Sequence, residues 1–245
     1  AVRLRKLQQL RADGVDPYPA TWPVSHTLAQ AAVLPAGATG LRLAGRLISI
    51  RRMGKLSFAH LRDASGQLQV AVRASELTAD QANLWDESVD VGDFVGMSGE
   101  LFTTKTGALT LLARELTLLA KTLRPLPEKW HGLKDLELRL RKRYLDLTAN
   151  PEIRELFIKR ARLITALRGY LDGHGFIEVE TPVLELIPGG ADAKPFVTHH
   201  ETLDLDLYLR ISLELHLKRL VVGGFERVYE MGKVFRNEGM SPQHL

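Results

Sequence analysis

The chain has 245 residues, 45% of them hydrophobic and 25% charged, with a formal net charge of +4 at pH 7. This is the composition of an ordinary globular protein of one or two domains, and the mild positive charge permits a polyanionic partner. No cysteine is present, which excludes a disulfide framework, a thiolate nucleophile and a cysteine-based metal site. No apolar run reaches membrane-spanning length and no signal peptide is recognisable, so we expect a cytoplasmic protein without a membrane partner.

Residues 1–40 are predicted to form a short helix and a connector. A leucine recurs at every third position of the first turns, at Leu4, Leu7 and Leu10, which indicates an amphipathic helix over residues 1–12. Gly14 and two nearby prolines end it. The basic side chains of this helix fit either contact with a phosphate backbone or an ordinary solvated face.

Residues 41–119 change to the alternating pattern of strands. A helix pattern at 75–86 separates the third strand from the fourth, and turn sequences lie at 64–66 and 104–107. This is the arrangement of an OB-fold barrel, a fold that often binds single-stranded nucleic acid on aromatic and basic side chains. The predicted strands are 41–51, 56–63, 67–73, 94–103 and 108–118.

Phe58 is the candidate aromatic side chain on this barrel. Basic residues surround it in the sequence, namely Arg46, Arg51, Arg52, Lys55 and Arg62. A single Phe in a strand is more often part of a core than a surface on which bases stack, so the residues alone leave both interpretations open.

Residues 120–150 are predicted to be a charged linker. Their basic run at 138–147 fits either contact with an RNA backbone or a solvated helical face. Asn150 and Pro151 are typical of a helix start, and the apolar spacing that follows predicts a long helix to about Leu171. Residues 176–183 alternate and predict a strand. The adjacent His199 and His200 point to opposite faces of a strand, so no metal site is expected there.

Residues 225–238 alternate apolar and polar side chains and predict a half-buried strand. Arg236 and Glu238 are two residues apart, so they share one face. An arginine suits a phosphate because its planar fork donates hydrogen bonds in pairs. By themselves such residues more often form a surface ion pair on an edge strand.

The neighbouring sequence distinguishes these alternatives. Residues 225–238 resemble motif 2 of class II aminoacyl-tRNA synthetases, and residues 151–183 resemble motif 1. The likeness includes the run Ile187-Pro188-Gly189-Gly190-Ala191, and it is to lysyl-tRNA synthetases more than to their aspartyl and asparaginyl relatives. It extends through residues 194–196, 199–200, 203–211 and 217–224.

The resemblance implies an α+β fold with four parts. These are an N-terminal helix and connector (1–40), an OB-fold anticodon-binding domain (41–119), a linker (120–150), and the first part of a class II antiparallel-sheet catalytic domain (151–245). Motif 3 would lie beyond residue 245. The motif 1 region, 151–183, would form a homodimer.

The resemblance also implies a chemistry, in which lysine is activated with ATP and transferred to the 3′ end of tRNA(Lys). Arg236 would bind the α-phosphate, Glu238 would contact ATP, and His244 would lie near the ATP phosphates. Gly190 and Glu214 would line the lysine pocket.

In the barrel, the resemblance implies that Phe58 stacks on an anticodon base and that Gln69 hydrogen-bonds there, with Arg46 and Arg62 beside them. Ala108 stands where the family commonly has a glutamate that contacts the central base. The ligands of Mg²⁺ and the acid that recognises the lysine ε-ammonium group are expected beyond residue 245, so residues 1–245 alone are expected to be inactive.

Three other functions remain open at this point. The first is a non-catalytic tRNA-binding protein that uses the OB domain. The second is a related ligase that lysylates a protein, although such ligases typically lack the N-terminal barrel. The third is specificity for aspartate or asparagine.

Overall fold

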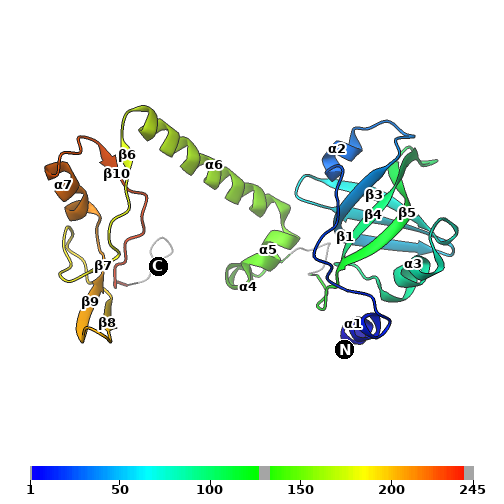
Figure 1. The fold of residues 1–245 in the computed structure, drawn as a ribbon, viewed down its shortest axis with the longest axis horizontal. Helices are drawn as coiled ribbons and strands as arrows, with labels where there is room; N and C mark the ends of the chain where they lie inside the picture. The colour runs from blue at the N-terminus through cyan, green and yellow to red at the C-terminus, as the bar shows by residue number, and fades with distance from the viewer. Residues whose placement is uncertain (1, 127–132, 240–245) are drawn as a thin grey trace. The chain divides into compact units, whose positions relative to one another are not determined.

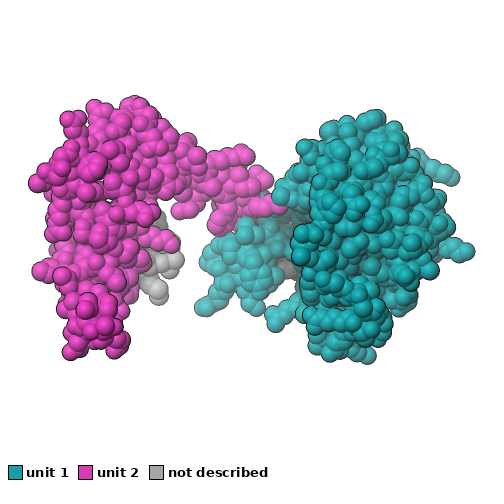
Figure 2. Space-filling model, in the orientation of Figure 1, with its two compact units in different colours: residues 1–151 teal, residues 152–245 magenta. Residues whose placement is uncertain are grey.

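The computed structural model describes residues 2–126 and 133–239, and the chain divides into two compact units (Figures 1 and 2). Unit 1 comprises residues 1–151 and unit 2 comprises residues 152–245. Within the described ranges, no helix is both long enough and apolar enough to cross a membrane.

Unit 1 is built on a closed barrel of five strands, which confirms the predicted OB-type arrangement. The order around the barrel is β1-β2-β3-β5-β4, and all neighbours pair antiparallel except β3 and β5, which pair in parallel. The five predicted strands end within two residues of the observed ones. They are β1 (Leu41–Met53), β2 (Leu56–Arg62), β3 (Gln67–Arg73), β4 (Phe94–Thr103) and β5 (Leu109–Ala120).

The single helix predicted at 75–86 is wrong in detail, because the chain there forms three short pieces. These are η1 (Ala74–Glu76), α3 (Ala79–Asn83) and η2 (Leu84–Ser88). Thr78 and Gln81 form a capping box that starts α3 afresh. The Val89 amide then bonds to the Leu84 carbonyl, five residues back. This wider turn accompanies the burial of the Trp85 side chain, which is 2% exposed.

The predicted N-terminal helix is confirmed as α1 (Val2–Ala12), and a second short helix, α2 (Leu28–Ala32), follows. Arg3 donates to the carbonyls of Val91 and Thr122, and Lys6 pairs with Asp90 at 2.8 Å. Two of the four basic side chains of α1 therefore hold the helix against the barrel rather than facing a partner.

The basic run of the linker forms α4 (Leu136–Arg141) and α5 (Arg143–Ala149). The Asp146 carboxylate is fully buried and accepts hydrogen bonds from Arg139, Arg143 and Asn150. Burial alone would raise the pKa of Asp146, but the hydrogen bonds from Asn150 and Arg139 outweigh it and lower that pKa. Two arginines of the run are thus internal partners of a carboxylate.

The predicted long helix, α6 (Pro151–Gly173), starts at the last residue of unit 1 and makes up the first part of unit 2, which continues with short elements. A parallel pair joins β6 (Ile177–Glu178) to β10 (Val228–Tyr229). An antiparallel sheet has the order β7-β9-β8, formed by Leu184–Glu185, Leu205–Leu209 and Val197–His200. Helix α7 (Glu214–Val222) follows β9. Figure 1 shows α7 beside the short β6–β10 pair.

The long strands predicted at 176–183 and 225–238 are wrong, because only two residues of each pair. Pairing stops where Thr181 turns its amide to the Glu230 side chain. Beyond Tyr229 the chain to residue 239 is extended but irregular. Its amides at Phe235 and Asn237 bond to the carbonyls of Arg210 and Lys194 instead of to a strand. Alternation of apolar and polar residues favours a strand, but a strand also requires a hydrogen-bonding partner along its length.

Candidate functional site

The barrel has an outer face, which we define by Arg46, Ser49, Phe58, His60, Arg62 and Gln69. Strand β2 alternates strictly, with Ser57, Ala59 and Leu61 buried and Phe58, His60 and Arg62 partly exposed. The core interpretation of Phe58 is therefore wrong, because its ring lies on the side of the sheet opposite the core.

Strand register brings the rest of the outer face together. Arg46 pairs with Arg62, Ser49 pairs with His60, and His60 pairs with Gln69 on the other side. Directly opposed residues point to the same face of a sheet, with Cβ atoms about 5 Å apart. All four predicted anticodon residues therefore occupy one continuous surface.

This surface is electropositive. Burial and the nearby Arg62 charge lower the pKa of Arg46, and the Arg46 guanidinium lies 4.4 Å from the centroid of the Phe94 ring. Two neighbouring guanidinium groups repel each other, and a phosphate between them would relieve that repulsion.

Three polar residues on or beneath the outer face were not singled out from the sequence. The hydroxyl of Ser49 lies 3.0 Å from the His60 ring nitrogen Nδ1. The buried Thr110 hydroxyl donates to Gln69 Oε1 at 2.7 Å, which orients the Gln69 amide. The sequence could have placed His60 on the outer face, because it follows Phe58 by two residues in the same strand. It could not have placed Ser49 there, because a bulge between Leu47 and Ser49 shifts the register of β1.

In unit 2, three predicted site residues gather at the connection between β9 and α7. Gly190 has φ +81°, and a Cβ there would lie 3.1 Å from Ser212 Oγ and 3.3 Å from Glu214 Cβ. The Arg236 Nε donates to the Ile211 carbonyl at 3.4 Å. A glycine at position 190 thus keeps open the space beside Glu214.

The two carboxylates of this region differ in their surroundings. Glu214 stands at the first turn of α7 and pairs with Lys218 at 2.5 Å. Glu238 is exposed, as is Arg236, so the Arg236 guanidinium is accessible to an anion. The predicted residue His244 lies outside the described residues.

Mg²⁺ does not fit the described residues by themselves. Among residues 2–126 and 133–239, no group of three or more His, Cys, Asp or Glu side chains is arranged to hold a metal ion. Cations of this kind require converging carboxylate oxygens. An exposed arginine, by contrast, suits a nucleotide phosphate.

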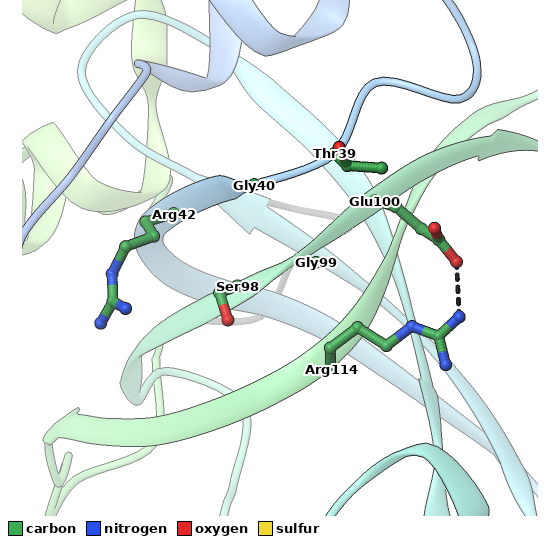
Figure 3. A pocket seen from close by; sticks show the side chains of 7 residues that line it. All are labelled: Thr39, Gly40, Arg42, Ser98, Gly99, Glu100 and Arg114. Carbon is green, nitrogen blue, oxygen red and sulfur yellow. Dashed lines mark hydrogen bonds and ion pairs between the residues drawn. The ribbon is translucent and has the colours of Figure 1, made fainter.

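A hollow of about 330 Å³ lies elsewhere on the barrel and contains none of the predicted site residues (Figure 3). Its two guanidinium groups already have acidic partners: Arg114 pairs with Glu100 at 2.6 Å, and Arg42 pairs with Glu115 at 3.4 Å. Carboxylates therefore neutralise the charge that an anion would need. The lining residues are Thr39, Gly40, Arg42, Ser98, Gly99, Glu100 and Arg114.

Two family models match the chain. Residues 41–125 match the OB-fold nucleic acid binding domain, and residues 135–245 match the class II tRNA synthetases (D, K and N). The barrel and the helix-and-sheet region that follows it thus correspond to an OB-fold domain and to the start of a class II synthetase domain.

Curated relatives match the whole length of the chain. It is 53% identical over 246 residues to a lysine–tRNA ligase of Moorella thermoacetica and 50% identical over 252 residues to one of Dehalococcoides mccartyi. It is also 48% identical over 252 residues to one of Bacillus subtilis. These alignments cover 99–100% of this chain and 50% of each relative, so the chain spans about half the length of the relatives it matches.

Proposed function

We propose that the protein carrying this chain is a lysine–tRNA ligase, which activates lysine with ATP and transfers it to the 3′ end of tRNA(Lys). The whole-length likeness to lysine–tRNA ligases, at 48–53% identity in three relatives, carries this proposal. The two residue clusters support it, because each contains the residue types that its step requires. We further propose that the protein acts in the cytoplasm.

In the activation step, the lysine carboxylate attacks the α-phosphate of ATP in line with the departing pyrophosphate. Catalysis of this kind depends on positioning and on neutralising developing negative charge. Arg236 binds the α-phosphate and Glu238 contacts ATP. Glu214 receives the lysine α-ammonium group beside Gly190. His244 contributes near the ATP phosphates. Mg²⁺ would supply further neutralising charge at the phosphates, and no group of three or more acidic or histidine side chains among the described residues is arranged to hold it.

In tRNA recognition, the outer barrel face binds the anticodon. Phe58 stacks on a base, and Gln69 hydrogen-bonds to a base edge. Arg46 and Arg62 contact the backbone, which adds affinity without base preference. The paired register of the two arginines and the lowered pKa of Arg46 support an anion between them.

The test is ATP–pyrophosphate exchange by the full chain as its gene encodes it, with lysine, aspartate and asparagine in parallel. Exchange that depends on lysine is expected. Exchange that depends on aspartate or asparagine would contradict the proposal that lysine is the substrate. Tight tRNA binding without any exchange would instead support a non-catalytic tRNA-binding protein, for which the intact barrel and its outer face are the favouring observation.

We also propose that the protein is a homodimer through residues 151–183. Helix α6 has no buried residue over its 23 positions, and its apolar side chains Leu156, Phe157, Leu163, Leu167 and Tyr170 are 46–69% exposed. An apolar surface of this kind is typical of an interface.

Leu163→Asp is expected to convert a dimer to a monomer, because it would bury a charge without a partner. Light scattering on the full chain measures this, with Lys105→Asp on the β4–β5 turn as control. A wild-type monomer, or a Leu163→Asp variant that remains dimeric, would contradict the dimer proposal.

A further inference from the structure

We propose that the buried ion pair of Arg210 and Glu230 is the positioning device for the segment that carries Arg236. The catalytic consequence of this inference rests on the proposed function. Arg210 lies just after β9, and Glu230 lies just after β10. Neither residue was a candidate in the sequence, because each lies inside an apparently regular strand pattern.

The pair is almost completely removed from solvent. Arg210 Nη1 lies 2.6 Å from Glu230 Oε1, and the two side chains are 4% and 5% exposed. Burying two charges is costly unless each gains hydrogen bonds as well as its partner. Such a pair therefore requires a set of further contacts.

Those contacts join three separate segments of unit 2. Arg210 Nε donates to the Lys233 carbonyl at 2.9 Å, and Nη1 donates to the carbonyl and hydroxyl oxygens of Thr181 at 3.1 Å each. The Thr181 hydroxyl and amide donate in turn to Glu230 Oε2, at 2.6 and 3.2 Å. The pair thus ties the chain after β6 and the chain after β10 to the end of β9.

The same residues lead directly to Arg236. The carbonyl of Arg210 accepts from the Phe235 amide at 2.9 Å, and the carbonyl of Ile211 accepts from Arg236 Nε at 3.4 Å. Gly232 lies against the pair so closely that a Cβ there would collide with Arg210 Nη2 and Glu230 Oε1. Side chain and backbone of Arg210 therefore hold both ends of the short stretch 233–235.

This stretch has no regular structure to hold it otherwise. Residues 230–239 form neither helix nor strand, so the extended path that delivers Arg236 depends on these specific contacts. Buried ion pairs are often no better for stability than apolar side chains of similar size. A positioning role and a purely stabilising role consequently predict different behaviour when the pair is replaced.

The experiment uses the full chain with four changes: Arg210→Lys, Glu230→Gln, Thr181→Val, and the double change Arg210→Met with Glu230→Met. The double variant removes both charges together, so it leaves no unpaired buried charge. We expect it to keep a thermal midpoint near that of the wild type while kcat for lysine-dependent pyrophosphate exchange falls about 100-fold, the effect of a misplacement near 1 Å. The KM for lysine is expected to change less than threefold. Arg210→Lys is expected to recover part of kcat.

Hydrogen exchange supplies a readout that does not depend on activity. Each variant is expected to speed amide exchange in the peptide 231–238 at least tenfold, while α6 exchanges as in the wild type. Asp206→Asn is the matched control. It removes an exposed pair with His199 on β9, the strand that leads to Arg210, and it should change neither readout.

The outcomes test the positioning role of the Arg210–Glu230 pair separately from the proposed ligase function. Folded variants with kcat within twofold of the wild type and unchanged exchange at 231–238 would overturn the positioning role. Loss of protection throughout unit 2 in Thr181→Val, the mildest change, would also overturn it in favour of a general stabilising role. A wild-type chain without pyrophosphate exchange activity would refute the proposed function, and the hydrogen-exchange comparison would still decide the positioning role.

Discussion

At the scale of single residues, the face of β2 on which Phe58 lies decides whether its ring fills the core or is available to a partner. Its β2 neighbours Ser57 and Ala59 are 3% and 1% exposed, so the ring of Phe58 cannot be needed to fill the core. It lies instead on the same face of β2 as His60, which pairs with Gln69, and as Arg62, which pairs with Arg46. The sequence made Phe58, Arg46 and Arg62 candidates and the family resemblance added Gln69, but only strand pairing showed that the four share one surface.

Phe58→Ala is expected to weaken tRNA binding about tenfold, because stacking of a base on an aromatic ring contributes about 1–3 kcal/mol. Fluorescence anisotropy at one fixed salt concentration measures this. Phe58→Trp, which keeps a flat ring, should bind within threefold of the wild type. Equal affinity for the alanine and tryptophan variants would show that no base stacks there.

At the scale of elements, Asp63 joins the β2–β3 turn to α2. Its carboxylate accepts from the amides of Ser65, Gly66 and Leu28 at 2.7–2.9 Å and from the Ser65 hydroxyl at 2.6 Å. Partial burial alone would raise the pKa of Asp63, but the hydrogen bonds from Leu28, Ser65 and Gly66 outweigh it and lower that pKa. The turn therefore depends on an ionised carboxylate.

The sign of the pH dependence follows from this lowered pKa. An unfolded aspartate has a pKa near 3.9, so the stability from ionised Asp63 is fully present above about pH 5 and is lost as pH falls through the folded pKa. Asp63→Asn should lower the free energy of unfolding by a constant amount from pH 7 to 5, and that deficit should shrink towards pH 3. Urea unfolding measures it, with the exposed Asp80→Asn as control. A deficit that is the same at every pH would contradict the role of the charge.

Also at the scale of elements, the segment 74–88 was predicted to contain a single helix but forms three short pieces. The residues favour a helix locally, yet burial of Trp85 and the Thr78 capping box divide it. The predicted strand at 225–238 failed for the opposite reason: its alternation was real, but its polar side chains serve buried contacts such as that of Glu230 with Thr181.

At the scale of the whole molecule, the two units differ in their burial. The barrel core contains many side chains that are 0–5% exposed, whereas the buried hydrophobic residues of unit 2 within the described ranges are Ile211 and Tyr229. Apolar burial is the main favourable term in folding, so the two units are expected to differ in stability.

A polypeptide of residues 1–245 is therefore expected to unfold in two transitions, with unit 2 melting first. Scanning calorimetry measures this, and a fragment of residues 1–126 should reproduce only the upper transition. The polypeptide should also bind tRNA while lacking pyrophosphate exchange. One cooperative transition, absent from the fragment, would contradict the independence of the barrel.

The sequence by itself determined the elements whose formation is local: the five barrel strands through two-residue alternation, and α1 and α6 through apolar spacing with helix-ending residues. Motif likeness also made Gly190, Glu214 and Arg236 candidate site residues, a prediction that experiment has to decide. The tertiary structure decided the rest: which side of β2 faces water, where the pairing of β10 ends, and how Arg210 and Glu230 meet across 20 residues. These features depend on partners distant in the chain, and the free energy of a buried contact exists only once those partners have been brought together.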